Sequence, residues 1–283
     1  MSKDNLKEKD VFAKRLMEFA NSSAEYVMRD SEWTIKGFID IFKNIYALST
    51  DTKVISKVLK LHLFPQFLNF AESIWYRLEP AEYQNWYPDL TFIKDNDHGV
   101  KFAVDLKTTY RDENRPAFCN GFTLGSHGEY FVRRESKKNI QYPYNEYMGH
   151  FCFGIIYSRM RSIEKHVAGS YSLNDLLAIP SVASHFVFFA QEKWKIASDK
   201  SGSGNTANIG SIHRIDDILA GNGVFALAGE EIFDDYWANF GKMQVPCKNG
   251  EYKPLSSLDE YLAYKRLPAS LKNSAHRRIG ANP

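Results

Sequence analysis

The tripeptide Asp105-Leu106-Lys107 could take part in phosphodiester hydrolysis. It lies within KFAVDLKTTY, a stretch whose apolar and β-branched residues favour a strand. Side chains two positions apart in a strand point to the same face, so Asp105 and Lys107 are expected to project side by side, with Leu106 on the opposite face. An acidic residue, any residue and a lysine also occur at 51–53, 135–137 and 251–253. The strand context therefore distinguishes residues 105–107 from the other matches.

Asp89 could supply a second carboxylate. It directly precedes the apolar run 90–93, and the turn-forming residues KDNDHG separate this run from the apolar run 102–106. This pattern predicts a β-hairpin, whose pairing would return Asp89 to the side of Asp105. Two carboxylates with open coordination positions suit Mg²⁺, for which Mn²⁺ is a possible substitute. The chemistry indicated is metal-assisted hydrolysis of a phosphodiester, and the alternative is a surface hairpin with an ordinary ion pair.

Lys107 could either activate a water molecule or stabilise negative charge at a phosphate. Neighbouring carboxylates favour its charged form, whereas a bound metal ion disfavours it. We expect a cationic Lys107 that positions the attacking water and stabilises the developing negative charge, while the metal lowers the pKa of that water.

The glycine-rich segment 201–211, SGSGNTANIGS, could enter a DNA groove. Its glycines allow close backbone approach, and asparagine can bond to adenine N6 and N7 in the major groove, which makes Asn205 the best candidate reader. A flexible linker is the alternative interpretation. Because the Gly-Lys-Ser/Thr ending of a nucleotide-phosphate loop is absent from this segment, we expect no nucleotide cofactor.

Helices and strands must intermix to position these residues, so the fold class is α/β or α+β. In the N-terminal half, the helical spacing and apolar runs predict a helix over 11–20, a helix from 54 to 78 that is capped by Asp51 and broken near Pro65, and the hairpin. The next predicted elements are a helix that runs into a buried strand over 144–160 and a buried strand over 185–197 that is ended by a loop over 198–210. Two late helices are predicted over 230–240 and 257–267.

The composition is that of an ordinary globular protein: 283 residues, 44% hydrophobic, with a formal net charge of +2. The mean hydropathy is −0.41, and the sequence contains no apolar run long enough to span a membrane and no secretory signal, so we expect no membrane association and a cytoplasmic location. The three cysteines include no Cys-x-x-Cys pair, which argues against disulfides and a thiolate zinc site.

Taken together, the segments GFIDIFKNIYALSTDTK, QNWYPDLTF, FAVDLKTTY, KKNIQYPYNEY and SGSGNTANIGSIH resemble the EcoRV-type restriction endonucleases of the PD-(D/E)xK nuclease superfamily. The resemblance implies a restriction-endonuclease-like fold with a central mixed β-sheet flanked by helices. No shift in composition divides the chain, so we expect a single domain over 1–283, with an N-terminal helical extension over about 1–30 and a mobile basic tail over about 268–283.

By the same resemblance, Asp89 and Asp105 would hold Mg²⁺ with the backbone carbonyl of Leu106, and Lys107 would be the catalytic lysine. The major-groove reading residues would be Gly202, Ser203, Gly204, Asn205, Thr206 and Asn208, and those of the minor groove Gln84 and Asn85. Positions near the phosphates or the cleavage centre would be Thr52, Lys53, Ser56, Thr108, Thr109, Tyr110 and Lys138.

The resemblance further implies a homodimer that cuts palindromic double-stranded DNA to blunt ends, at GATATC or a close relative. Lys60 departs from the family pattern, because it stands where the family has an acidic residue linked to a further metal position. We expect cleavage to survive Lys60→Ala, because the ion between Asp89 and Asp105 would not use this position. Tyr83, Trp86 and Ala207 are further departures. Two alternatives remain: a repair or structure-selective nuclease of the same superfamily, and a DNA-binding relative without catalysis.

Overall fold

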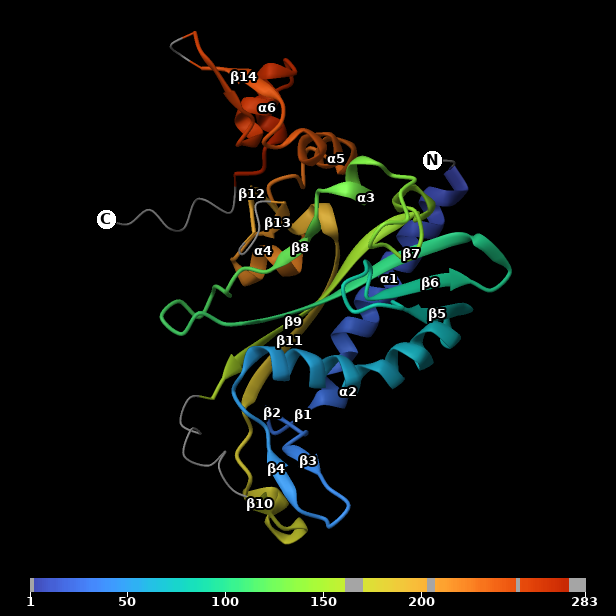
Figure 1. Cartoon of the computed structure of the whole chain (residues 1–283), viewed down its shortest axis with the longest axis vertical. Coiled ribbons are helices and arrows are strands. Elements are labelled where there is room, and N and C mark those ends of the chain that lie inside the picture. The colour runs from blue at the N-terminus through green and yellow to red at the C-terminus, as the bar shows by residue number, and fades with distance from the viewer. Residues whose placement is uncertain (1–2, 161–169, 203–206, 248–249, 275–283) are drawn as a thin grey trace.

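The computed structural model describes residues 3–160, 170–202, 207–247 and 250–274. At its centre is a seven-stranded sheet of order β1-β2-β11-β9-β7-β6-β5 (Figure 1). Its strands are β1 (Met28–Arg29), β2 (Glu32–Trp33), β5 (Tyr76–Pro80), β6 (Leu90–Lys94), β7 (Asp97–Tyr110), β9 (Gly149–Arg159) and β11 (Ala183–Glu192). Strands β7 and β9 are parallel, whereas β6 and β7 are antiparallel. The expected mixed sheet flanked by helices, and with it the predicted fold class, is confirmed.

Two hydrophobic cores lie against the sheet, and the alternation of β7 assigns its side chains between them. Phe102, Val104 and Leu106 join the core that contains residues of α1 (Lys3–Val27) and α2 (Thr52–Ser73). Ala103 joins the second core, which contains residues of the C-terminal part of the chain. Successive strand residues point to opposite faces, so Asp105 and Lys107 are on the same side as Ala103.

The remaining elements form smaller units around this sheet (Figure 1). One three-stranded sheet consists of β3 (Gly37–Ile39), β4 (Ile45–Ala47) and β10 (Ser170–Tyr171), which is followed by the 3₁₀ helix η3 (Leu173–Ala178), and a second consists of β8 (Thr123–Ser126), β12 (Ala197–Ser201) and β13 (Asn208–Ser211). A two-stranded hairpin consists of β14 (Gln244–Pro246) and β15 (Tyr252–Pro254). The remaining helices are α3 (Glu129–Val132), α4 (Ile215–Ala220), α5 (Glu230–Asn239), α6 (Leu258–Tyr264) and the 3₁₀ helices η1 (Tyr144–Glu146), η4 (Lys193–Ile196) and η5 (Ala269–Leu271).

The helix expected to break near Pro65 is continuous, so that expectation is wrong. α2 spans Thr52–Ser73 with Pro65 inside it, and Asp51 caps it as predicted by accepting hydrogen bonds from the N–H groups of Lys53 and Val54. A proline inside a helix costs roughly 3 kcal/mol, but α2 buries several large apolar residues, including Phe67, and this packing outweighs the cost. The helix ends before residue 78 because residues 76–80 form β5.

Other predicted elements also differ from the structure. The strand expected over 185–197 ends at Glu192, because residues 193–196 form the 3₁₀ helix η4. The helix expected over 11–20 extends over 3–27, and the loop expected over 198–210 contains the paired ends of β12 and β13. The late helices over 230–240 and 257–267 are confirmed as α5 and α6. The stretch 144–160 is a single 3₁₀ turn followed by the buried strand β9.

The C-terminal segment is packed as far as the structure describes it. Lys272, expected in a mobile basic tail, is buried, and its Nζ forms ion pairs with Asp199 at 2.8 Å and Asp259 at 2.7 Å. Residues 275–283 of the expected tail lie outside the described residues. The single-domain organisation stays a prediction. Among the described helices, none has the length and apolar character needed to cross a membrane.

Candidate active site

The β6–β7 hairpin brings Asp89 and Asp105 together, as the sequence predicted. Leu90 pairs with Val104, which places Asp89 opposite Asp105. The two carboxyl groups line one pocket, and Asp89 Oδ2 accepts a hydrogen bond of 2.8 Å from the Leu106 N–H. The contact of Leu106 with Asp89 is thus made by its backbone N–H, and a role for its carbonyl stays a prediction.

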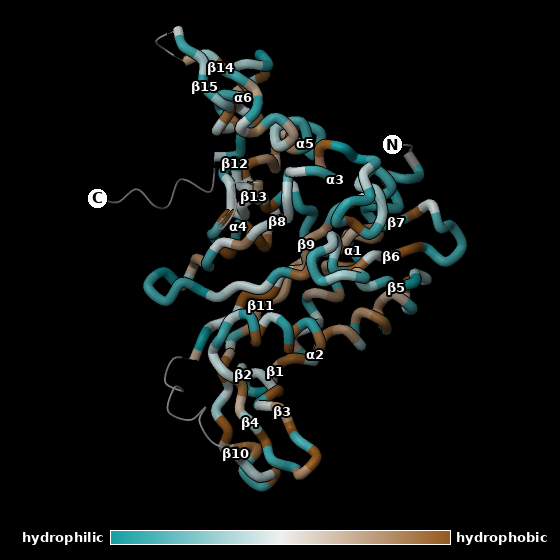
Figure 2. Tube along the Cα trace, in the orientation of Figure 1, coloured by the Kyte–Doolittle hydropathy of each residue, from teal (hydrophilic) through white to brown (hydrophobic). Residues whose placement is uncertain are grey.

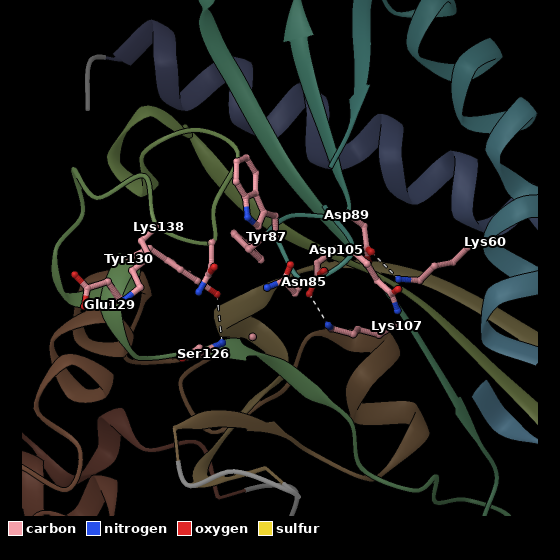
Figure 3. Close-up of a pocket in the computed structure, with 14 residues that line it drawn as sticks. Lys60, Asn85, Tyr87, Asp89, Asp105, Lys107, Ser126, Glu129, Tyr130 and Lys138 are labelled. Carbon is pink, nitrogen blue, oxygen red and sulfur yellow. Dashed lines mark hydrogen bonds and ion pairs between the residues drawn. The ribbon is translucent and has the colours of Figure 1, made fainter. Parts of the chain in front are cut away.

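Lys107 lies beside Asp105 on the same face of β7, which confirms the expected geometry. The distance from Lys107 Nζ to Asp105 Oδ2 is 2.6 Å. Figure 3 shows Lys107, Asp105 and Asp89 grouped in one pocket. One ammonium and two carboxylates therefore converge.

Lys60 is a fourth charged member of this group. It extends from α2, and its Nζ lies 2.6 Å from Asp89 Oδ1 (Figure 3). Lys60 therefore contacts the acidic pair directly, and the survival of cleavage in Lys60→Ala stays a prediction. No local pattern signals the contact, because the two residues are 29 positions apart and belong to different elements.

The charges of these groups shift one another's pKa values. Burial and the neighbouring Asp105 raise the pKa of Asp89 against the opposing effect of Lys60 and Lys107. Burial alone would raise the pKa of Asp105, but the charge and hydrogen bond of Lys107 lower it overall. For Lys107, burial would lower the pKa, but the two carboxylates raise it above its ordinary value. Lys107 is therefore an ammonium ion at neutral pH, as expected.

These four residues line a cleft of about 370 Å³. The side chains of Lys60 and Lys107 retain 28% and 22% of their exposure, so the charged centre is accessible from solvent. Its walls include the predicted minor-groove residues Gln84 and Asn85 and the predicted phosphate-contact residue Lys138. The structure thus gathers residues from four separate segments of the chain around the acidic pair.

Several predicted contact residues do not line this cleft. Thr52, Lys53 and Ser56 lie in the first two turns of α2. Thr109 shares the face of Asp105, but it is buried and its hydroxyl donates to the carbonyl oxygen of Asn120. Thr108 and Tyr110 alternate to the face of Leu106.

The segment predicted to read bases lies partly outside the described residues. The structure does not describe Ser203, Gly204, Asn205 and Thr206, but it describes the residues on either side of them. The Gly202 N–H donates a hydrogen bond of 2.8 Å to the carbonyl oxygen of Asn208. Asn208 of β13 pairs with Ser126 of β8, and Ser126 lines the cleft. The residues that flank the glycine-rich segment are therefore connected to the wall of the cleft through the pairing of β13 with β8.

A buried aromatic cluster supports the cleft, and the sequence analysis did not identify it. The Tyr87 hydroxyl lies 3.0 Å from His150 Nδ1, and the rings of Tyr144 and His150 stack at 3.7 Å. Lys193 Nζ lies 5.1 Å from the centroid of Tyr87 and has no hydrogen-bond partner among the described residues. The stretch 185–197 contains two lysines, Lys193 and Lys195, among its aromatic and apolar residues, and no local pattern indicates which of them is buried.

Comparison with known proteins identifies the family. A family model described as restriction endonuclease EcoRV matches residues 29–266. The chain belongs to the EcoRV restriction endonuclease family. A curated relative, the type II restriction enzyme EcoRV of Escherichia coli, is 35% identical over 234 residues, covering 82% of this chain and 92% of the relative.

Membership of the EcoRV family makes the chain a homologue of a type II restriction endonuclease, a hydrolase that acts on double-stranded DNA. The resemblance seen in the sequence is thereby confirmed. Among the described residues, no group of three or more His, Cys, Asp or Glu side chains could hold a metal ion. The Asp89–Asp105 pair still fits a hard divalent cation, because such ions commonly take one or two carboxylates and complete their shell with water and substrate oxygens.

Proposed function

We propose that this EcoRV-family enzyme uses Mg²⁺ to hydrolyse phosphodiester bonds within a palindromic site of double-stranded DNA. GATATC or a close relative is the proposed site, and blunt ends are the proposed product. The observation that supports the proposal is the convergence of Asp89, Asp105 and Lys107 in a solvent-accessible cleft.

Asp89 and Asp105 would hold the metal ion, together with the carbonyl of Leu106. When bound, such an ion lowers the pKa of a coordinated water and stabilises negative charge on the phosphate. Lys107 is protonated, because the adjacent carboxylates raise its pKa. It is therefore suited to orient the attacking water and to stabilise the developing charge, rather than to remove a proton as a base.

Base recognition is proposed for the glycine-rich segment and the minor-groove loop. Asn205 would contact adenine in the major groove, and Gln84 and Asn85 would contact the minor groove from the wall of the cleft. Lys138, which also lines the cleft, would contact a backbone phosphate, a kind of contact that positions the duplex without choosing its sequence. The flexible central TA step would ease the bend that brings the scissile phosphate to the ion.

We propose a homodimer, in which two-fold symmetry matches a palindromic site. An apolar lobe supports a second copy of the chain as the partner. This lobe comprises exposed residues of the β3–β4 hairpin and η3, namely Phe38, Ile39, Ile41, Phe42 and Leu177. Figure 2 shows hydrophobic residues at the tip of this hairpin. Exposed apolar clusters of this kind are typical of protein–protein interfaces.

Digestion of a plasmid of known sequence with Mg²⁺, followed by sequencing of the ends, tests the proposal. We expect blunt cuts at one palindromic sequence. Asp105→Asn and Lys107→Met should each lower kcat by roughly 100-fold or more, because each removes a charge at the reacting phosphate. Asp97→Asn, which alters an exposed residue of the same strand, should cleave like the wild type. Staggered ends, random nicking or full activity of Asp105→Asn would contradict the proposal.

Asn205→Ala distinguishes a restriction enzyme from a structure-selective nuclease of the same superfamily. It should abolish specific cleavage in the first and have little effect in the second. A wild-type protein that binds a palindrome but never cuts it with Mg²⁺ or Mn²⁺ would instead be a DNA-binding relative without catalysis.

A further inference from the structure

Lys60 covers the outer oxygen of the carboxylate that would bind metal. Asp89 Oδ2 accepts the Leu106 N–H at 2.8 Å, while Asp89 Oδ1 lies 2.6 Å from Lys60 Nζ. We infer that the Lys60 ammonium is a built-in counter-ion that occupies the place of a divalent cation at Asp89 and must leave before such a cation binds. This inference rests on the metal-dependent function proposed above.

The charge balance of the centre explains why a counter-ion is needed. Asp89 and Asp105 lie opposite each other in the hairpin, and their side chains keep only 27% and 14% of their exposure, so their negative charges repel each other. Lys107 Nζ lies 2.6 Å from Asp105, and Lys60 pairs with Asp89. Two ammonium groups thus balance two carboxylates. Without Lys60 the group would have a net negative charge until a cation arrived.

Lys60 is also able to leave. Its side chain is 28% exposed, whereas its neighbour Leu59 is fully buried and holds α2 in place. The flexible four-carbon stem of lysine therefore allows the ammonium to swing into solvent while the helix stays packed. Lys60 would thus compete with the metal ion and lower its affinity, in contrast to an acidic residue at the same position.

Measurement of Mn²⁺ binding at pH 8 without DNA tests the inference, with the electron paramagnetic resonance signal of free Mn²⁺ as the readout. Lys60→Met should bind Mn²⁺ roughly tenfold more tightly than the wild type, because one competing charge is removed. Lys60→Arg keeps a cation and should bind like the wild type. The matched control is Lys57→Met, an exposed lysine of the same helix, and it should change affinity by less than about twofold.

The outcomes separate this inference from the proposed function. If Lys60→Met binds Mn²⁺ no more tightly than the wild type, the counter-ion role is wrong, while loss of binding in Asp105→Asn would still support the metal centre. If Asp105→Asn binds Mn²⁺ like the wild type, the proposed metal centre fails and the inference fails with it.

Thermal unfolding in EDTA gives a second readout that does not depend on metal affinity. Lys60→Met should lower Tm by roughly 2–4 °C, because the Asp89–Asp105 repulsion loses one counter-charge, and Mn²⁺ should raise its Tm more than that of the wild type. A Lys60→Met protein that unfolds in EDTA at the same temperature as Lys57→Met would contradict the inference.

Discussion

At the scale of single residues, the protein keeps lysines in two different environments around its acidic pair. Lys107 is paired with Asp105, and the carboxylates raise its pKa. Lys193 is more deeply buried, and aromatic rings surround its ammonium group, including Tyr87 and Phe131. Burial lowers the pKa of Lys193 to about 8, although the more distant Asp105 and Asp234 oppose the shift. The pKa values of the two lysines therefore shift in opposite directions, because Lys193 is more buried and only Lys107 is in contact with a carboxylate.

Lys193→Met should change the pH dependence of stability. The pKa of Lys193 falls from 10.5 in the unfolded chain to about 8 in the folded protein. Between these values the unfolded state binds more protons, so this group makes the wild type more stable as pH rises. The free energy of unfolding of the wild type, relative to that of Lys193→Met, should increase by up to about 3 kcal/mol from pH 7 to pH 10.

Urea unfolding of both proteins at several pH values measures this difference. The same comparison with Lys57→Met, which removes an exposed lysine, should be nearly independent of pH. A constant difference between the wild type and Lys193→Met over the whole range would show that Lys193 titrates as an ordinary surface lysine.

At the scale of elements, α1 is an integral part of the first hydrophobic core. The family model begins at residue 29, after this helix ends. Yet Phe12 of α1 is buried, and its ring stacks on Phe102 of β7 at 4.1 Å. Lys9 of the same helix forms ion pairs with Glu192 at 2.6 Å and Glu230 at 2.5 Å. α1 therefore supports the strand that bears Asp105 and Lys107 from the opposite face of the sheet.

Phe12→Ala should destabilise the protein by about 3–5 kcal/mol, because it removes a buried ring and leaves a cavity against β7. The free energy of unfolding in urea measures the loss. Val11→Ala alters the adjacent, exposed residue and should change stability by less than about 0.5 kcal/mol. An equally small effect of Phe12→Ala would mean that α1 is dispensable for the core.

At the level of the whole molecule, a charged cleft and an apolar lobe lie in different regions. The cleft and the strands that flank the glycine-rich segment lie on the side of the sheet that faces the second hydrophobic core. The apolar lobe of β3, β4 and η3 forms one end of the molecule, away from β14 and α6 at the other end (Figure 1). The residues of the apolar lobe are therefore separate from those that line the charged cleft.

The double variant Ile41→Asp/Phe42→Asp should convert a dimer into a monomer. It places charges on side chains that are 90% and 78% exposed and that a dimer would bury, which should raise the dissociation constant roughly 100-fold or more. Sedimentation equilibrium should give twice the chain mass of 32.6 kDa for the wild type and the single mass for the variant.

Leu227→Asp, which alters an exposed leucine outside the lobe, should remain dimeric. The dimer interface would have to lie elsewhere if the double variant kept the mass of the wild type. A monomeric wild type would contradict the proposed homodimer itself.

The local geometry of the site could be predicted from short stretches of the chain. The alternation of side chains in a strand is a property of the backbone, so the shared face of Asp105 and Lys107 followed from their spacing. The hairpin followed from two apolar runs and a turn, and it placed Asp89 opposite Asp105. The cap at Asp51 depended on contacts within three residues.

Which distant groups meet these residues depends on how the helices and strands pack in three dimensions. The contact of Lys60 with Asp89 depends on how α2 packs beside the sheet. The aromatic surroundings of Lys193 likewise come from segments far apart in the chain. The continuity of α2 through Pro65 also required burial against the sheet, which outweighed a local preference. The pKa values of the lysines and the continuity of α2 through Pro65 depend on packing and desolvation. Both are properties of the folded protein rather than of any short stretch of sequence.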